Sequence, residues 1–136
     1  MSAARELRSA VLAGTVCFAI VFAIGFVLGT IRTLLLVPRV GPLVAVAIEL
    51  PIMIAASWFA CRFGLRRYAI AAAVLPRLLV GTVAVSLLLA AELGISLTLG
   101  GLNAAQHFAL YARPEHQLGL AAQLLFGLMP MLQRQP

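Results

Sequence analysis

The stretch Gly25-Phe26-Val27-Leu28-Gly29-Thr30-Ile31-Arg32 ends a long apolar run and decides how the chain is expected to fold. On a helix, Gly25, Gly29 and Arg32 share one face, because they are four and then three residues apart. Two glycines four residues apart allow a neighbouring backbone to come close. We therefore predict that another helix packs on this face, within the bundle or in a dimer, and that Arg32 lies on the approached side.

The composition is that of a membrane protein. Of the 136 residues, 63% are hydrophobic and 10% are charged, and the mean hydropathy is +1.09. Soluble domains contain about 25% charged residues, and a soluble chain of this length cannot bury so much apolar surface. We expect an all-α integral membrane protein, because helices satisfy their own backbone hydrogen bonds in lipid. The lipid bilayer is then its first partner.

Four apolar segments predict a single domain with four transmembrane helices, at about residues 10–31, 42–60, 78–99 and 114–132. The mildly amphipathic segment 102–113 predicts a short interfacial helix before the fourth span. The prolines and glycine in 33–42 predict a tight turn at the surface, although the first helix can extend to Val37. The first run is too long for a signal peptide, so we expect it to be retained.

The start of the third span has two solutions, because Pro76 and Arg77 interrupt the run that begins at Ala69. In the first solution, 69–75 lies in the interface and Arg77 stays at the surface. In the second, the span begins at Tyr68 and Arg77 is buried. We favour the first, because an arginine in the middle of a membrane costs about 3 kcal/mol. Whether Arg77 is buried stays open at this stage.

The net charge of +6 comes from arginines that lie just outside the apolar runs. This placement gives no basic face, so we predict no nucleic-acid partner. Cytoplasmic loops are enriched in basic residues. The four-span arrangement places three arginines on one side (Arg32, Arg39 and Arg113) and seven on the other (Arg5, Arg8, Arg62, Arg66, Arg67, Arg77 and Arg134). We therefore expect a multi-pass protein of the bacterial inner membrane with both termini in the cytoplasm.

Two acids lie inside apolar runs at matching depths. Glu49 is seven residues from Pro42, and Glu92 is seven residues from Leu99. A rise of about 1.5 Å per residue places each carboxyl roughly 10 Å below the outer end of its helix. Arg32 lies just above them, and Arg39 follows it on the same side. We predict a membrane-embedded polar cluster of Arg32, Glu49, Glu92 and Arg39, with the Arg32 guanidinium between the two acids.

The predicted cluster has two interpretations. Ionisable side chains inside a membrane generally mark proton relays, ion paths or sites for charged solutes. A group that neutralises itself also works as a clamp that fixes the register of the helices. The clamp is favoured at this stage, since no translocation path is visible in the sequence.

Other candidate residues carry packing roles. Besides Gly25 and Gly29, we assign helix packing to Pro51, Gly119 and Gly127. The two cysteines and two histidines do not form the ligand spacing of a metal site, so we predict no metal and no cofactor. We find no nucleophile, base and acid in a catalytic arrangement, and we expect no enzyme activity.

The runs GFVLGTIRTLLLVPR, ELP and AAELG resemble those of short bacterial four-helix membrane proteins. This resemblance implies a fold and brings no known activity. The length is also superficially similar to that of the small multidrug-resistance transporters, which have four helices and a membrane-embedded glutamate. Their glutamate lies in the first helix, where this chain has none, so that family's function is not carried over.

The expected function is therefore non-enzymatic. We predict an accessory or structural subunit of the inner membrane that self-associates or docks on a larger membrane complex, because the loops are short and glycine faces are present. The alternative is a small oligomeric transporter or channel in which protonation of Glu49 or Glu92 is coupled to movement of a solute.

Overall fold

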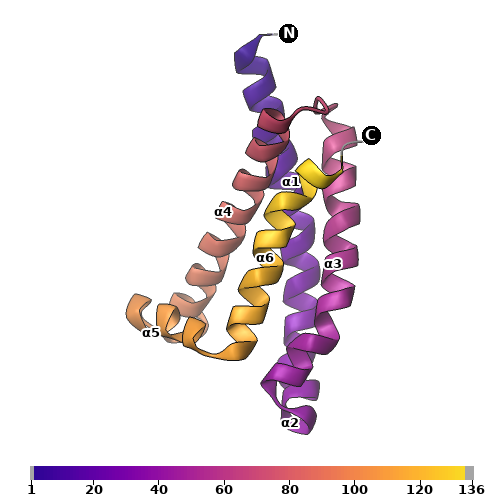
Figure 1. Cartoon of the computed structure of the whole chain (residues 1–136). Helices are drawn as coiled ribbons and strands as arrows, with labels where there is room; N and C mark the ends of the chain where they lie inside the picture. The colour runs from indigo at the N-terminus through magenta and orange to yellow at the C-terminus, as the bar shows by residue number, and fades with distance from the viewer. Residues whose placement is uncertain (1, 134–136) are drawn as a thin grey trace.

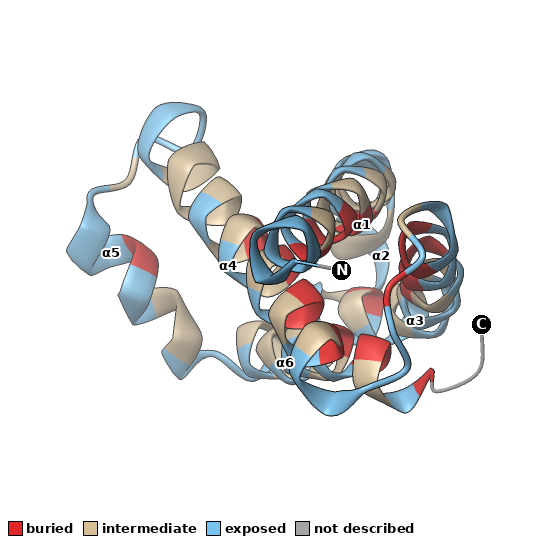
Figure 2. Ribbon diagram, turned by 90° about the horizontal axis from the view of Figure 1, so that it is seen from above, coloured by how far each residue is buried: buried red, intermediate tan, exposed pale blue. Residues whose placement is uncertain are grey.

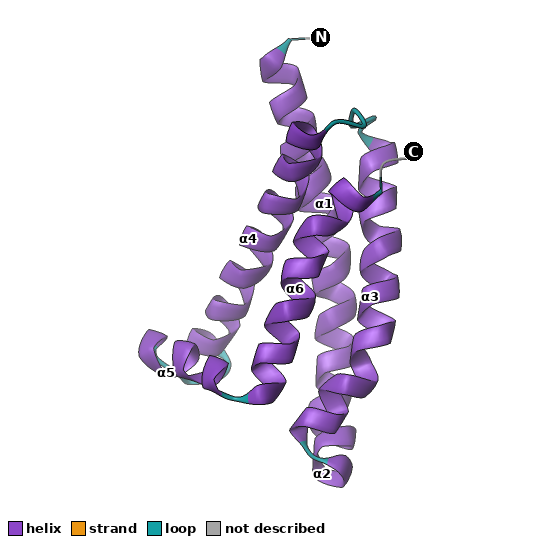
Figure 3. Ribbon diagram, viewed as in Figure 1, coloured by secondary structure: helices purple, strands orange, loops and turns teal. Residues whose placement is uncertain are grey.

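The computed structural model describes residues 2–133, and within this range the chain is helical with no strand (Figures 1 and 3). Three helical segments are long and apolar enough to cross a membrane, namely Ala3–Val40, Pro42–Arg67 and Val74–Thr98. The elements in order are α1 (Ala3–Ile31), the π-helical turn η1 (Arg32–Leu36), α2 (Val37–Val40), α3 (Pro42–Arg67), α4 (Val74–Thr98), α5 (Ala104–Ala109), the 3-10 turn η2 (Leu110–Ala112) and α6 (Pro114–Leu132).

The four long helices form a bundle whose neighbours do not follow the order of the chain. Helix α1 packs against α3 and α4, and α6 packs against the same two helices from the other side. Helices α3 and α4 follow each other in sequence yet lie diagonally opposite. The connection 68–73 therefore crosses the end of the bundle at which both termini lie (Figure 1). Helix α5 and the turn at α2 lie at the other end.

The first helical segment runs further than predicted. Instead of forming a tight turn over 33–42, the backbone stays helical to Val40, beyond the limit of Val37 that the sequence allowed, and only Gly41 leaves it, with φ +83°. Pro38 lacks an N–H and would break the hydrogen-bond ladder of an α-helix. The π turn accommodates Pro38 without ending the helix. In this turn the N–H of Val37 donates to the carbonyl of Arg32, five residues back. Arg32 is therefore the first residue of a π turn, an element that is frequent at functional sites.

The second helix also exceeds its predicted bounds, since α3 continues through Cys61 to Arg67 instead of ending at residue 60. Arg62, Arg66 and Arg67 are exposed on this extension. Helix α6 occupies the interval predicted for the fourth span, but it is not among the three segments that are long and apolar enough to cross a membrane. Arg134, one of the predicted orientation residues, lies outside the described residues.

Arg77 is buried within the bundle, which corrects the favoured prediction of a surface position, although α4 begins at Val74 and not at Tyr68, the start that the alternative solution required. Its exposed fraction is 3%, and it lies in the first turn of α4. The guanidinium donates to the carbonyls of Ile70 and Ala71 in the crossing connection, and to those of Pro130 and Gln133 at the end of α6. A cation at the carbonyl end of a helix is favourable, because those oxygens carry partial negative charge. Arg77 thus binds the crossing connection and α6 to α4.

The core occupies the end of the bundle next to the termini. Here α1, α3, α4 and α6 meet through small side chains, and we name this part the closed half (Figure 2). A Cβ added to Gly14 would lie 2.8 Å from the carbonyl oxygen of Val80, and one added to Gly64 would lie 2.7 Å from the sulfur of Cys17. A Cβ on Gly81 would collide with the carbonyl oxygen of Gly127. Gly127 therefore lies at a close contact between α4 and α6.

We expect Gly81→Ala to lower the thermal unfolding midpoint of the detergent-purified protein, with a loss of about 1–3 kcal/mol from overpacking. The matched control is Gly94→Ala in the same helix, where an added Cβ meets no atom within 4 Å. The control should leave the midpoint unchanged or raise it, because alanine favours a helix over glycine. Equal midpoints for the two variants would contradict the close contact of α4 with α6.

Candidate functional site

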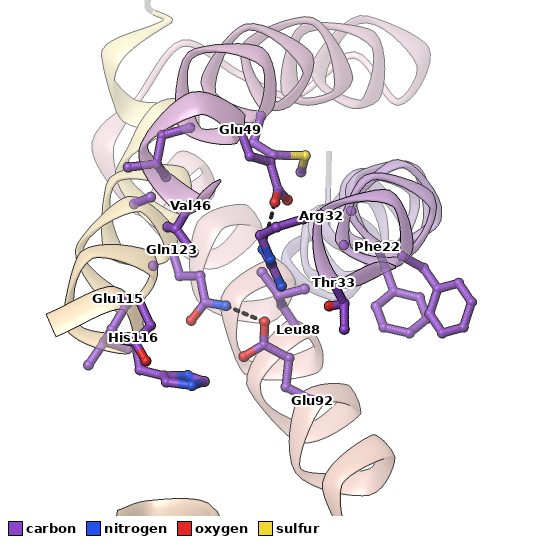
Figure 4. A pocket seen from close by; sticks show the side chains of 18 of the residues that line it. Phe22, Arg32, Thr33, Val46, Glu49, Leu88, Glu92, Glu115, His116 and Gln123 are labelled. Atoms are coloured by element: carbon purple, nitrogen blue, oxygen red, sulfur yellow. Dashed lines mark hydrogen bonds and ion pairs between the residues drawn. The ribbon is translucent and has the colours of Figure 1, made fainter. Parts of the chain in front are cut away.

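The half of the bundle next to α2 and α5, which we name the open half, contains a cavity of about 740 Å³. All four long helices line it, and α5 and η2 contribute at its edge. Small-molecule sites in proteins have volumes of about 300–1,000 Å³, so this cavity has the size of a ligand site. Most of its lining is apolar, and its charged side chains come from η1, α3, α4, the start of α6 and the residue before α6 (Figure 4).

Arg32 and Glu49 form an ion pair inside this cavity. The Nη1 atom of Arg32 lies 2.6 Å from Oε2 of Glu49, and their side chains are 31% and 10% exposed. The pair joins η1 to the start of the third turn of α3. A charge-assisted bond of this length is among the stronger hydrogen bonds in proteins. The predicted approach of Arg32 to Glu49 is present in the structure.

Glu92 has a different partner from the one predicted. Its Oε1 accepts a hydrogen bond from the side-chain amide of Gln123 in α6, while Arg32 is bonded to Glu49. Figure 4 shows the Arg32 side chain between the two acids, close enough to attract Glu92 electrostatically. The three residues therefore line one cavity, but the guanidinium does not bridge both carboxylates. The reason is that Gln123, on the neighbouring α6, supplies a donor that helix depth alone does not reveal.

Arg39 lies apart from the cluster to which it was assigned. It is exposed in α2 and does not line the cavity. Pro51, assigned to helix packing, is also exposed, and α3 continues through it. Arg39 belongs to the one-turn helix α2, which lies at the end of the bundle away from the termini (Figure 1). The cluster that remains consists of Arg32, Glu49 and Glu92.

Three glycines assigned to helix packing face the cavity instead. A Cβ on Gly25 would meet only the methyl of Met53, at 3.4 Å, and one on Gly29 only the Arg32 guanidinium, at 3.5 Å. A Cβ on Gly119 would meet nothing within 4 Å. No backbone atom of another helix lies within 4 Å of an added Cβ at these glycines. At this end of the bundle α6 and α4 diverge from α1 (Figure 1). Their missing side chains leave room for the cavity.

Aromatic and imidazole groups, which were not predicted as site residues, line the edge of the cavity. His107 is buried, and its Nδ1 lies 2.7 Å from Oγ of Ser96, which ties α5 to α4. The ring of Tyr111 meets those of His107 and His116 edge to face. Burial and the negative charge of Glu92 raise the pKa of Tyr111, so its hydroxyl stays protonated and available as a donor. The capping box of Asn103 and Gln106 fixes the start of α5.

Cys17 and Cys61 are neighbouring free thiols buried between α1 and α3. Cys17 donates to the carbonyl of Ala60 at 3.5 Å. They lie in the closed half, away from the cavity. Within residues 2–133, no group of three or more histidine, cysteine or acidic side chains is arranged to hold a metal ion.

A scan against protein-family models and searches of curated proteins and of solved structures found no match to this chain. The resemblance to short bacterial four-helix membrane proteins therefore stays a prediction.

We expect Arg32→Gln to destabilise the protein by about 1–3 kcal/mol, because it leaves the Glu49 carboxylate without its cation in a largely buried position. The double variant Arg32→Gln/Glu49→Gln should recover much of this loss, since it removes both charges. The thermal unfolding midpoint in detergent measures both effects. Arg39→Gln is the control and should change little, because that side chain is exposed. A double variant no more stable than Arg32→Gln would exclude the pair as a source of stability.

Proposed function

We propose that the chain is a bacterial inner-membrane protein with four spans: α1, α3, α4 and α6. Three segments have the length and apolar composition that crossing requires. Helix α6 has 19 residues and packs between α3 and α4. At about 1.5 Å per residue it is close to 28 Å long, about the thickness of the hydrocarbon core.

The proposed orientation places both termini in the cytoplasm. The bundle end with the termini carries six described arginines, against three at the end with α2 and α5. Basic residues favour the cytoplasmic side. The open half and its cavity then face the outer side of the membrane.

We further propose that the protein binds a small solute in this cavity and belongs functionally with small transporters. The observation that supports this function is a 740 Å³ cavity that holds Arg32, Glu49 and Glu92 within an apolar bundle. Ionisable groups are costly in a membrane, and they usually mark a path or site for polar solutes. A purely structural clamp would leave no space beside the charges, whereas here a cavity remains between the bonded side chains of the four helices.

An accessory or structural subunit is the second candidate, and exposed apolar side chains favour it. Val27, Leu34 and Leu35 are between 52% and 67% exposed on α1 and η1. Such a surface suits lipid or a neighbouring membrane protein. Purification in mild detergent from the native membrane, followed by mass spectrometry, distinguishes the roles. A stoichiometric partner protein would favour the subunit, and the chain alone would favour the solute-binding protein.

Water access to the cavity tests the proposed function directly. In a background of Cys17→Ala and Cys61→Ala, we expect Gly119→Cys to react with a membrane-impermeant maleimide added from outside the cell. The reactive form of a thiol is the thiolate, which forms where water reaches it. Gly94→Cys is the matched control: it also has free space around its Cβ but does not line the cavity. It should react much more slowly.

The background without the two introduced cysteines gives the blank for this measurement. Failure of Gly119→Cys to react, in a protein whose unfolding midpoint matches that of the background, would exclude an outward-open solute site. Labelling only by reagent added from the cytoplasmic side would mean that the proposed orientation is wrong, while the cavity would still be accessible to water.

A further inference from the structure

The charges in the cavity do not balance, and this imbalance indicates what the cavity binds. Its lining has three carboxylates, Glu49, Glu92 and Glu115, and two guanidinium groups, Arg32 and Arg113. Arg32 is bonded to Glu49 at 2.6 Å, and Arg113 lies 3.9 Å from Glu115. Each guanidinium thus has its own acid. Of these three acids, Glu92 is the one without an ion-pair partner among the described residues.

The cavity lining also contains a buried hydrogen-bond acceptor that has no donor among the described residues. Gln123 uses its amide nitrogen to donate to Glu92, while its Oε1 is buried and has no partner among the described residues. Gln123 and Glu92 both line the cavity. A buried acceptor without a donor costs free energy, of the order of a lost hydrogen bond. A ligand with several N–H donors would satisfy Gln123 and Glu92 together.

The rest of the lining suits an apolar body. Leu88, Val46 and Phe22 line the cavity with the charged cluster (Figure 4). Tyr111 adds an aromatic ring at its edge, and aromatic faces attract cations. Gly119 leaves the space beside Gln123 empty on the same helix.

We infer that the cavity binds an amine in its ammonium form, carried on an apolar body, with the ammonium group between Glu92 and Gln123. This inference rests on the proposed solute-binding function and names the ligand class. An anionic ligand would need Arg32, which Glu49 already holds, and it would meet the charge of Glu92. An ammonium group would hold the Glu92 carboxylate in its ionised form, whereas a neutral ligand supplies no charge to offset the cost of ionising an acid in an apolar bundle.

Three probes of similar shape test the ligand class: 2-phenylethylammonium, the neutral 2-phenylethanol and the anionic 3-phenylpropanoate. Each is added to membranes that contain the Gly119→Cys protein before the impermeant maleimide. We expect 2-phenylethylammonium alone to slow labelling, by about tenfold at ten times its dissociation constant. Adding Glu92→Gln should abolish this protection, and adding Arg39→Gln should leave it intact, because Arg39 lies outside the cavity.

The thermal unfolding midpoint of the purified wild-type chain provides a second measurement that does not depend on the cysteine variants. The ammonium probe should raise the midpoint, and the other two should not, because a ligand that binds the folded state stabilises it. Midpoints are compared at the same detergent concentration, and the neutral probe corrects for effects on the micelle.

The outcomes separate this inference from the proposed function. Protection by 3-phenylpropanoate, or equal protection by all three probes, would overturn the ammonium class while keeping a solute site. Labelling without protection by any probe would also overturn the class. Protection that survives Glu92→Gln would remove Glu92 from the site. An absence of labelling at Gly119→Cys would instead overturn the proposed function itself.

Discussion

One constraint governs both halves of this bundle: helices approach each other only as closely as the groups between them allow. In the closed half, glycine at positions 14, 64, 81 and 127 brings backbones into contact. In the open half, the long side chains of Arg32, Glu49 and Glu92 stand between the helices, and a cavity remains. Tight packing at one end fixes where the helices start to diverge. The polar cluster then forms at the end where the bundle is widest, so the site depends on contacts far from it.

The charge arrangement in the open half follows from which helices are neighbours. The Arg32–Glu49 pair joins two helical segments that are adjacent in both sequence and space. Glu92, on α4, faces α6 and bonds to Gln123, while α3 lies across the bundle. Had the helices been arranged in chain order, α4 would have been next to α3, and Glu92 would have been close to Glu49. Because the connection crosses the bundle, Glu49 bonds to Arg32 and Glu92 bonds to Gln123. Glu92 is therefore left without a bonded cation.

The sequence predicted the depths of the charged residues well and their partners only in part. Helical rise alone was enough to bring Arg32, Glu49 and Glu92 to one level. Gly25 and Gly29 do not pack on another backbone within the bundle, because spacing shows that a face is small but does not show which helix lies opposite. Gly81 gave no such pattern, and its role appears only when α6 is docked on α4. Arg77 was misplaced because its acceptors are backbone carbonyls, which have no sequence signature.

The burial of Arg77 has a consequence for how the chain is made. Its acceptor Pro130 lies 53 residues further along the chain, so the ribosome delivers α4 well before the end of α6 exists. Until then the guanidinium lacks two of the carbonyls that it binds in the finished protein, and bare charge is expensive in an apolar environment. We therefore expect the N-terminal turn of α4 to stay near water while synthesis continues. The Arg77 guanidinium can be enclosed only after α6 has been made and has packed against α4. The order in which the helices assemble therefore depends on this one side chain.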